Sequence, residues 1–96
     1  MTLFAFPDDA RWNPDNESVE FTVSIGEYQG TVRIGCVIFR RLLGCAVSPE
    51  TCLESYHLHR TRIERAVEAK IRRRELAEDG NVDLVGRDLA RVGARA

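Results

Sequence analysis

The chain has 96 residues and a net charge of −1, with 44% hydrophobic and 30% charged residues. This length supports one hydrophobic core, and the balance of apolar and charged residues is typical of a soluble globular protein rather than a disordered one. The apolar runs are much shorter than the roughly 20 residues that span a bilayer, so we expect no membrane contact.

The N-terminus and the cysteines both indicate a cytoplasmic protein with reduced thiols. The opening MTLFAFPDDARW lacks the basic start and the apolar centre of a signal peptide. Cys36, Cys45 and Cys52 are odd in number and too few for a disulfide framework.

Acidic and basic side chains are unevenly spread along the chain. Residues 1–35 carry six acidic and two basic side chains, a net charge of −4, whereas residues 36–79 carry nine basic and seven acidic side chains, a net charge of +2. This pattern suggests that the acidic front of one subunit meets the basic middle of another.

The first segments predict a short strand and a loop. Residues 2–6, TLFAF, alternate in the manner of a strand. Residues 7–18 contain two prolines, two asparagines and three aspartates, which favour turns over regular structure.

The next two segments predict a β-hairpin. Residues 18–25 and 28–38 both alternate between apolar and polar side chains. Gly26, at the first of the two connecting positions, suits a type II′ turn. The turn pairs Ile25 with Tyr28, Val23 with Gly30, Phe21 with Val32, and Val19 with Ile34. A slip of one residue would set apolar against polar side chains all along the ladder, so this register is strongly preferred.

Two helices are predicted after the hairpin. Residues 39–44 favour a short helical turn that Gly44 stops. A long helix is then expected over about residues 49–79, because Ser48 can cap it and a proline suits its first position. Gly80 is its expected C-terminal stop.

The pattern predicts a two-layer α+β domain that includes the whole chain, residues 1–96. A small antiparallel sheet, built on the hairpin and short strands, packs on the helix of residues 49–79. Residues 80–96 are expected to add a short strand and a short helix, or to form a partly ordered tail.

The long helix has an apolar stripe, and its histidines flank that stripe on opposite borders. At 100° per residue, the stripe is formed by Leu53, Tyr56, Ile63, Val67 and Ile71. His57 and His59 lie about 200° apart, so they cannot bind one ion from a helix. We therefore expect no metal and no cofactor. A site made from both histidines with Cys45 and Cys52 is the weaker alternative, since their spacing matches no zinc pattern.

The opposite face of the helix carries four arginines, Arg62, Arg65, Arg72 and Arg73. They are interpreted first as a solvated face, neutralised by neighbouring glutamates. The second interpretation is an interaction surface for phosphate groups or for an acidic protein.

Arg60 falls inside the apolar stripe, where an unpaired charge would be costly. We predict an ion pair with Asp8 or Asp9, since the acidic loop can fold over the helix. Arg60→Met should then disturb folding more than Arg62→Met. An active-site role for Arg60 is the alternative.

Self-association is also expected. Leu58 and Leu76 fall at the same angle on the back of the predicted helix. An interface along that helix would use both leucines, and a small sheet also has open edges that invite pairing. A homodimer is the expected assembly.

No catalytic motif is found in the sequence. It has no glycine-rich phosphate loop, no Gly-x-Ser-x-Gly, and no Cys–His pair in a setting that would activate the thiol. We expect no catalytic residue and no enzyme, but a protein-interaction or regulatory module. A nucleic-acid-associated factor, acting through the four arginines, is the alternative.

Three motifs, taken in order, resemble a known family. A Phe-Pro-Asp opening with a tryptophan precedes a hairpin that ends in Cys-x-Ile, and a helix follows with His-Arg and, three residues later, Ile-Glu. These residues are Phe6, Pro7, Asp8, Trp12, Cys36, Ile38, His59, Arg60, Ile63 and Glu64. The stretch of residues 4–72 is similar to short, mostly proteobacterial proteins catalogued only as a domain of unknown function. Phe39 departs from the family's small hydroxyl residue, which removes a helix cap. The resemblance implies a small α+β fold and no assigned reaction or ligand.

Overall fold

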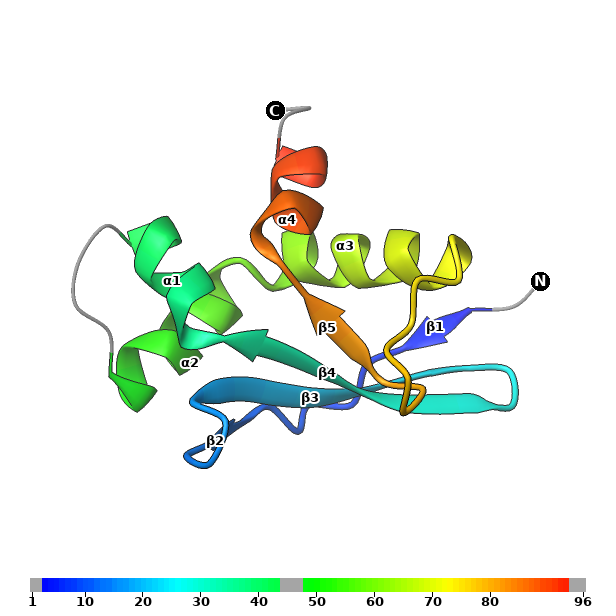
Figure 1. Ribbon diagram of the computed structural model, residues 1–96, viewed down its shortest axis with the longest axis horizontal. Helices are drawn as coiled ribbons and strands as arrows, with labels where there is room; N and C mark the ends of the chain where they lie inside the picture. Colours follow the sequence, from blue (N-terminus) through cyan, green and yellow to red (C-terminus); the bar gives the residue numbers. More distant parts are fainter. Residues whose placement is uncertain (1–2, 44–47, 94–96) are drawn as a thin grey trace.

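The computed structural model of the protein describes residues 3–43 and 48–93 (Figure 1). Gly44, the predicted stop of a helix, and Cys45 lie outside these ranges. The elements are β1 (Phe4–Ala5), β2 (Arg11–Asn13), β3 (Ser18–Ile25), β4 (Tyr28–Gly35), α1 (Cys36–Leu43), α2 (Pro49–Leu58), α3 (Arg60–Arg72), β5 (Val82–Leu84) and α4 (Gly86–Gly93).

The sheet is mixed, which corrects the expectation of a purely antiparallel one. β3 pairs antiparallel with β4 on one side and with both β1 and β2 on the other. β5 pairs with β4 in parallel, because three helices carry the chain back to the sheet in the direction of β4. The α+β class is confirmed.

The predicted hairpin register is confirmed. Ile25 lies opposite Tyr28 and Val19 lies opposite Ile34, with the other expected pairs between them. Gly26 has a φ of 59°, which the first central position of a type II′ turn requires and which glycine adopts without strain.

The second strand of the hairpin ends at Gly35, three residues before the predicted end at Ile38. α1 begins at Cys36, whose N–H donates to the Glu17 carbonyl oxygen at 2.9 Å. The apolar residues that begin at Cys36 form too short a run for their periodicity to distinguish a strand from a helix. Phe39 lies within α1 and its side chain is fully buried in the core. It is therefore not at the start of a helix, where a capping residue was expected.

The predicted helix of residues 49–79 is two helices. Its start is as expected: the Ser48 hydroxyl accepts the Thr51 N–H, and Pro49 is the first helical residue. The helix breaks at His59, where φ is −107° and ψ is 20°. A straight helix over residues 49–79 would be roughly 46 Å long. The longest dimension of the protein is 40 Å, so the break lets both halves cover the sheet.

α3 also ends earlier than predicted. Arg73 is its C-cap, and Arg74 takes the left-handed conformation with a φ of 60°. The Glu75 N–H then donates to the Lys70 carbonyl oxygen at 3.1 Å, which closes the helix end. Gly80, the predicted stop, instead lies in the turn before β5 with a φ of 83°.

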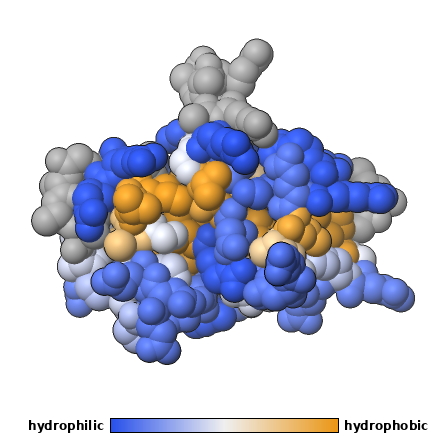
Figure 2. Space-filling model, viewed as in Figure 1, coloured by the Kyte–Doolittle hydropathy of each residue, from blue (hydrophilic) through white to orange (hydrophobic). Residues whose placement is uncertain are grey.

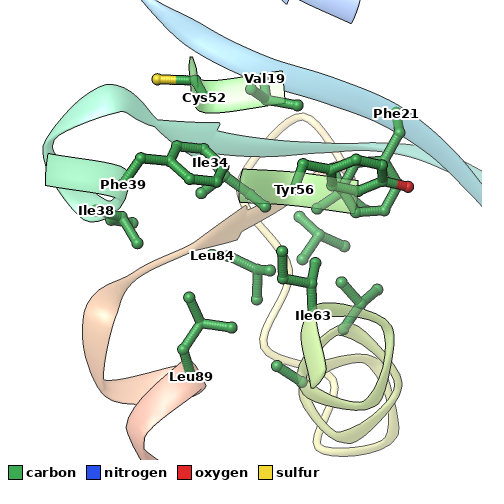
Figure 3. Packing of buried hydrophobic residues seen from close by; sticks show 14 of the residues in the cluster. Val19, Phe21, Ile34, Ile38, Phe39, Cys52, Tyr56, Ile63, Leu84 and Leu89 are labelled. Carbon is green, nitrogen blue, oxygen red and sulfur yellow. The ribbon is translucent and has the colours of Figure 1, made fainter. Parts of the chain in front are cut away.

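The core lies between the sheet and the helices. Figure 1 shows α3 over one face of the sheet and α1 and α2 together at one end of it. Inward-facing side chains of β3 and β4 meet side chains from β5 and all four helices (Figure 3). The Phe21 and Tyr56 rings are both fully buried in it, 4.9 Å apart between centroids. The two predicted layers are therefore present, with the helical layer divided among several helices.

Candidate interaction surfaces

Arg60 joins the N-terminal segment to α3. Its Nε donates to the Glu64 carboxylate at 2.8 Å and its Nη2 to the Phe6 carbonyl oxygen at 3.3 Å. Its Nη1 lies 3.6 Å from Asp8, one of the two predicted partners. The hydrogen bond to Glu64, together with the nearby Tyr56 and Asp8, raises the pKa of Arg60. Glu64 follows Arg60 by four residues, so helical spacing could have identified this partner.

Asp9, the other predicted partner of Arg60, binds elsewhere. Its carboxylate accepts the Thr22 N–H at 3.0 Å and the Thr22 hydroxyl at 2.5 Å, and it lies 3.7 Å from Arg11. Burial alone would raise the pKa of Asp9, but the Thr22 hydrogen bonds and the Arg11 charge outweigh it and lower the pKa. Asp9 thus fixes the loop to β3, while Asp8 faces α3.

The Tyr56 hydroxyl lies close enough to Arg60 and its acidic neighbours for their charges to affect its pKa. Tyr56 is fully buried, and its hydroxyl has no hydrogen-bond partner among the residues that the structure describes. Burial raises the pKa of Tyr56, and the Arg60 charge lowers it in part. His57 meets the Tyr56 ring edge-on at 5.0 Å and is itself exposed. In residues 3–43 and 48–93, no group of three or more His, Cys, Asp or Glu side chains is suited to a metal ion.

Three of the four arginines predicted as an interaction surface contact other parts of the protein. Arg62 donates to the Leu89 carbonyl oxygen of α4 at 2.9 and 3.2 Å. The Arg72 guanidinium lies 5.1 Å from the centre of the Phe4 ring. Arg73 pairs with Glu75 at 3.2 Å and lies 3.8 Å from Asp88, whereas Arg65 is exposed. These contacts leave less of the arginine face for a partner than the sequence suggests.

A buried carboxylate, which sequence reasoning missed, fastens α4 to α3. Asp88 accepts the Val85 N–H at 2.9 Å and the Lys70 ammonium at 2.8 Å. Burial alone would raise the pKa of Asp88, but these hydrogen bonds and the charges of Lys70 and Arg73 outweigh it and lower the pKa. Asp88 follows Val85 by three residues, a capping-box spacing that could have been found. Its pairing with Lys70 depends on the fold.

Hydrophobic side chains gather around β5. A groove of about 520 Å³ lies where β4 turns into α1 and β5 turns into α4, with Val37 and Val85 exposed in it. A second hollow of about 360 Å³, which contains Leu76, shares Asp83 and Val85 with this groove. Figure 2 shows hydrophobic surface between α1 and the junction of β5 with α4. We call Val37, Leu76 and Val85 the β5 surface.

The β5 surface contains three of the five large hydrophobic side chains exposed in the described residues. Beside it, Arg33 donates to Asp83 at 2.6 Å and to Asp79 at 3.1 Å. These hydrogen bonds, that to Asp83 first, raise the pKa of Arg33. Arg33, Asp79 and Asp83 are therefore paired with one another beside the β5 surface, whereas Arg87, which lines the second hollow, is exposed.

Leu58 and Leu76 do not share a helix. Leu58 ends α2 and is 80% exposed, whereas Leu76 follows the end of α3. The predicted interface along the back of one helix is thus wrong, because the helix breaks at His59 and ends at Arg72.

A separate pocket of about 320 Å³ lies between β2 and the starts of α1 and α2. The residues that line it are Trp12, Pro14, Glu17, Cys36, Arg40, Ser48 and Pro49. Cys36 is half-buried here, whereas Cys52 is fully buried in the core.

Comparison with known proteins shows the family. A family model described as "Protein of unknown function (DUF1488)" matches residues 4–84. The chain belongs to this family. A crystal structure of a DUF1488 protein of unknown function from Shewanella loihica PV-4 has 18% sequence identity and a TM-score of 0.77, and the match covers 84% of this chain and 90% of that chain. At this identity the likeness shows the fold alone. No curated protein matches the chain. The resemblance found in the sequence is confirmed, and DUF1488 carries no assigned role.

None of the helices in the described part of the chain has the length and hydrophobicity needed to cross a bilayer.

Proposed function

We propose that this protein is a non-catalytic interaction module of the bacterial cytoplasm, and that the β5 surface binds a second copy of the same chain. The observation that carries the proposal is the gathering of Val37, Leu76 and Val85 around one short edge strand. Exposed apolar patches of this kind, rimmed by polar groups, are typical of protein contacts.

The paired charges beside the β5 surface favour a second copy as the occupant. In a twofold contact the same surface serves both subunits, so its charges meet copies of themselves. Arg33 is held by Asp83 and Asp79 of its own chain. Two apposed copies would therefore bring apolar side chains together without leaving Arg33 or its two carboxylate partners unpaired between them.

Side-chain packing supports this contact better than strand pairing does. β5 has only three residues, and the Lys70 ammonium donates to the Asp83 carbonyl oxygen at 2.7 Å. This hydrogen bond competes with a strand added at that edge. The valines and Leu76 would then supply most of the contact.

Sedimentation equilibrium tests the proposal by comparing three proteins over a range of concentrations. The wild type should form a dimer, and a variant with both Val37→Glu and Val85→Glu should be monomeric, because each buried carboxylate would lack a partner. Leu58→Glu is the matched control, since Leu58 is the most exposed of these side chains and lies outside the β5 surface. The control should dimerise like the wild type.

Two results would contradict the proposal. One is a wild type that stays monomeric at its highest soluble concentration. The other is a dimer that Leu58→Glu dissociates and the valine double variant leaves intact, which would place the interface on α2.

A nucleic-acid role for Arg62, Arg65, Arg72 and Arg73 has less support, because three of these side chains have contacts within the protein. If all four displaced counterions from duplex DNA, log K would fall with log salt at a slope of roughly −3 to −4. Absence of binding to duplex DNA at low salt would end this alternative.

A further inference from the structure

Three cationic side chains of α3 hold α4 in place. Asp88 accepts a hydrogen bond from the Lys70 ammonium at 2.8 Å and lies 3.8 Å from Arg73. One residue later, the Leu89 carbonyl oxygen accepts two hydrogen bonds from Arg62, at 2.9 and 3.2 Å. We call Arg62, Lys70 and Arg73 the α4-docking face. These three side chains bind two neighbouring residues of α4.

A leucine supplies the apolar part of the same contact. Leu89 is 2% exposed and extends from α4 into the buried cluster that contains Leu84 and Ile63 (Figure 3). Among residues 86–89, the part of α4 whose burial the structure describes, Leu89 is the buried apolar side chain. α4 has only eight residues, and a helix of this length is marginal in water without its neighbours. Its position therefore depends on the anchors at Asp88 and Leu89.

The α4-docking face has more positive charge than α4 neutralises. Lys70 and Arg73 share the one carboxylate that Asp88 places between them. Arg62 donates to a carbonyl oxygen, and it has no ion pair with a carboxylate within residues 3–43 and 48–93. α4 also carries Arg87, an exposed positive charge of its own. A helix with a second carboxylate near Arg62 would therefore complement the face better than α4 does.

α4 can leave this face without disturbing the sheet. It begins at Gly86, beyond residues 4–84 that the family model matches, whereas α3 and β5 lie within them. No strand follows α4 in the described part of the chain, and the paired strands are all formed before it. The docking face therefore belongs to the matched part of the fold, and its occupant does not.

We propose that the α4-docking face binds an acidic amphipathic helix of a partner protein, and that α4 occupies the face until such a helix replaces it. Like α4, the partner helix carries an aspartate immediately before a leucine. It also carries a carboxylate one turn after that leucine, where it pairs with Arg62. Because α4 belongs to the same chain, its effective concentration at the face is high, and the partner needs this additional ion pair to compete. The contact is separate from the proposed dimer, which uses other side chains.

Nuclear magnetic resonance of the isotopically labelled, full-length chain tests this proposal, with an acetylated peptide of residues 85–96 as the probe. Asp88→Ala in the labelled chain should open the docking face, because the chain's own α4 loses its carboxylate anchor. The peptide should then shift the amide signals of α3 around Lys70 at a concentration roughly ten-fold or more below that needed for the wild type, since apparent affinity follows the fraction of chains whose face is free. Leu89→Ala, which removes the apolar anchor instead, should give the same result.

A second pair of peptides tests the acidic character of the partner. Gly93→Glu in the peptide places a carboxylate one turn after Leu89, whereas Gly93→Gln gives a side chain of the same length without the charge. The glutamate peptide should bind the Asp88→Ala chain roughly two- to five-fold more tightly than the glutamine peptide, the range for one exposed ion pair. This difference should disappear when Arg62→Met is added to the chain.

Asp83→Ala is the control chain, because the Asp83 side chain pairs with Arg33 and lies outside the docking face. It should bind the peptide as weakly as the wild type does. The proposal is overturned if the peptide binds the Asp88→Ala and Leu89→Ala chains no more tightly than the wild type. Shifts around Val37 instead of α3 would also overturn it, since they would assign the peptide to the β5 surface. Equal binding of the glutamate and glutamine peptides would overturn the acidic character of the partner.

Discussion

Asp88 joins three segments of the protein, and replacing it tests how far α4 depends on one carboxylate. Its side chain is 2% exposed and accepts hydrogen bonds from the Val85 N–H and the Lys70 ammonium. Alanine at this position would leave the N–H at the start of α4 without its acceptor. It would also leave the Lys70 ammonium, 11% exposed, with only its 2.7 Å hydrogen bond to the Asp83 carbonyl oxygen.

The expected loss follows from these contacts. Removing a capping acceptor costs about 1 kcal/mol, and removing one member of a buried ion pair costs about 3–5 kcal/mol. Because Lys70 keeps one carbonyl partner, we expect Asp88→Ala to lower the free energy of unfolding by about 3 kcal/mol in total. That is a large part of the roughly 5–15 kcal/mol typical of small domains. The melting temperature should fall by roughly 12–24 °C.

Urea denaturation at pH 7 and one protein concentration, followed by circular dichroism, measures this loss. Asp83→Ala is the matched control, because Asp83 also has an ion pair, at 2.6 Å to Arg33, but its side chain is 54% exposed. The control should lose less than about 1 kcal/mol. Equal midpoints for Asp88→Ala and Asp83→Ala would refute the role given to burial.

The contribution of Asp88 to the free energy of unfolding should also depend on pH. Its pKa in the folded protein lies below the ordinary value of 3.8, although burial alone would raise it, because the hydrogen bonds from Lys70 and Val85 and the Lys70 charge outweigh burial. A lowered folded pKa gives stability that is fully present above about 3.8 and is lost as the pH falls through the folded value. The difference in unfolding free energy between wild type and Asp88→Asn should therefore be constant near neutral pH and shrink in acid. A difference that grows in acid would contradict this sign.

Two further pairs of variants test contacts of the sheet and of α3. Arg60→Met should speed amide exchange near Phe6, whereas Arg62→Met should speed amide exchange in α4. The sequence predicts that Arg60→Met is the more damaging of the two. Because each variant loses charged hydrogen bonds, however, we expect their free energies of unfolding to differ by no more than about 1 kcal/mol. Exchange that rises equally in both regions for both variants would refute this division. Tyr28→Phe removes the 2.7 Å hydrogen bond to the Gly80 carbonyl oxygen and should cost about 1 kcal/mol by urea denaturation. Gly30→Ala should cost more, about 1–2 kcal/mol, since its methyl group would meet the Tyr28 hydroxyl and ring; a stabilised Gly30→Ala would show that the ring moves away freely.

The parts of the fold that the sequence predicts well are those with a local cause. The hairpin register follows from an alternation with period two and from Gly26, and both act within a few residues. The start of α2 follows from Ser48 and Pro49, whose effects are also local.

The parts that the sequence misses depend on distant contacts. No glycine or proline marks the break at His59 or the left-handed Arg74, and both follow from how the helices fit on the sheet. The parallel pairing of β5 is set by the path of three helices rather than by Val82 and its neighbours. Among the site residues, Asp88 could be placed at a capping position, but its pairing with Lys70 needed α4 to be positioned against α3.

The charge pattern along the chain has a different meaning once the fold is known. The acidic front and the basic middle were expected to meet between subunits, yet Asp8 lies 3.6 Å from Arg60 of the same chain, and the Arg72 guanidinium lies over Phe4. Part of the attraction between the acidic front and the basic middle therefore acts within one molecule. Surface ion pairs between subunits would in any case add little to the free energy of association. Self-association is therefore supported chiefly by the exposed apolar side chains of Val37, Leu76 and Val85, and in second place by the internal pairing of Arg33 beside them.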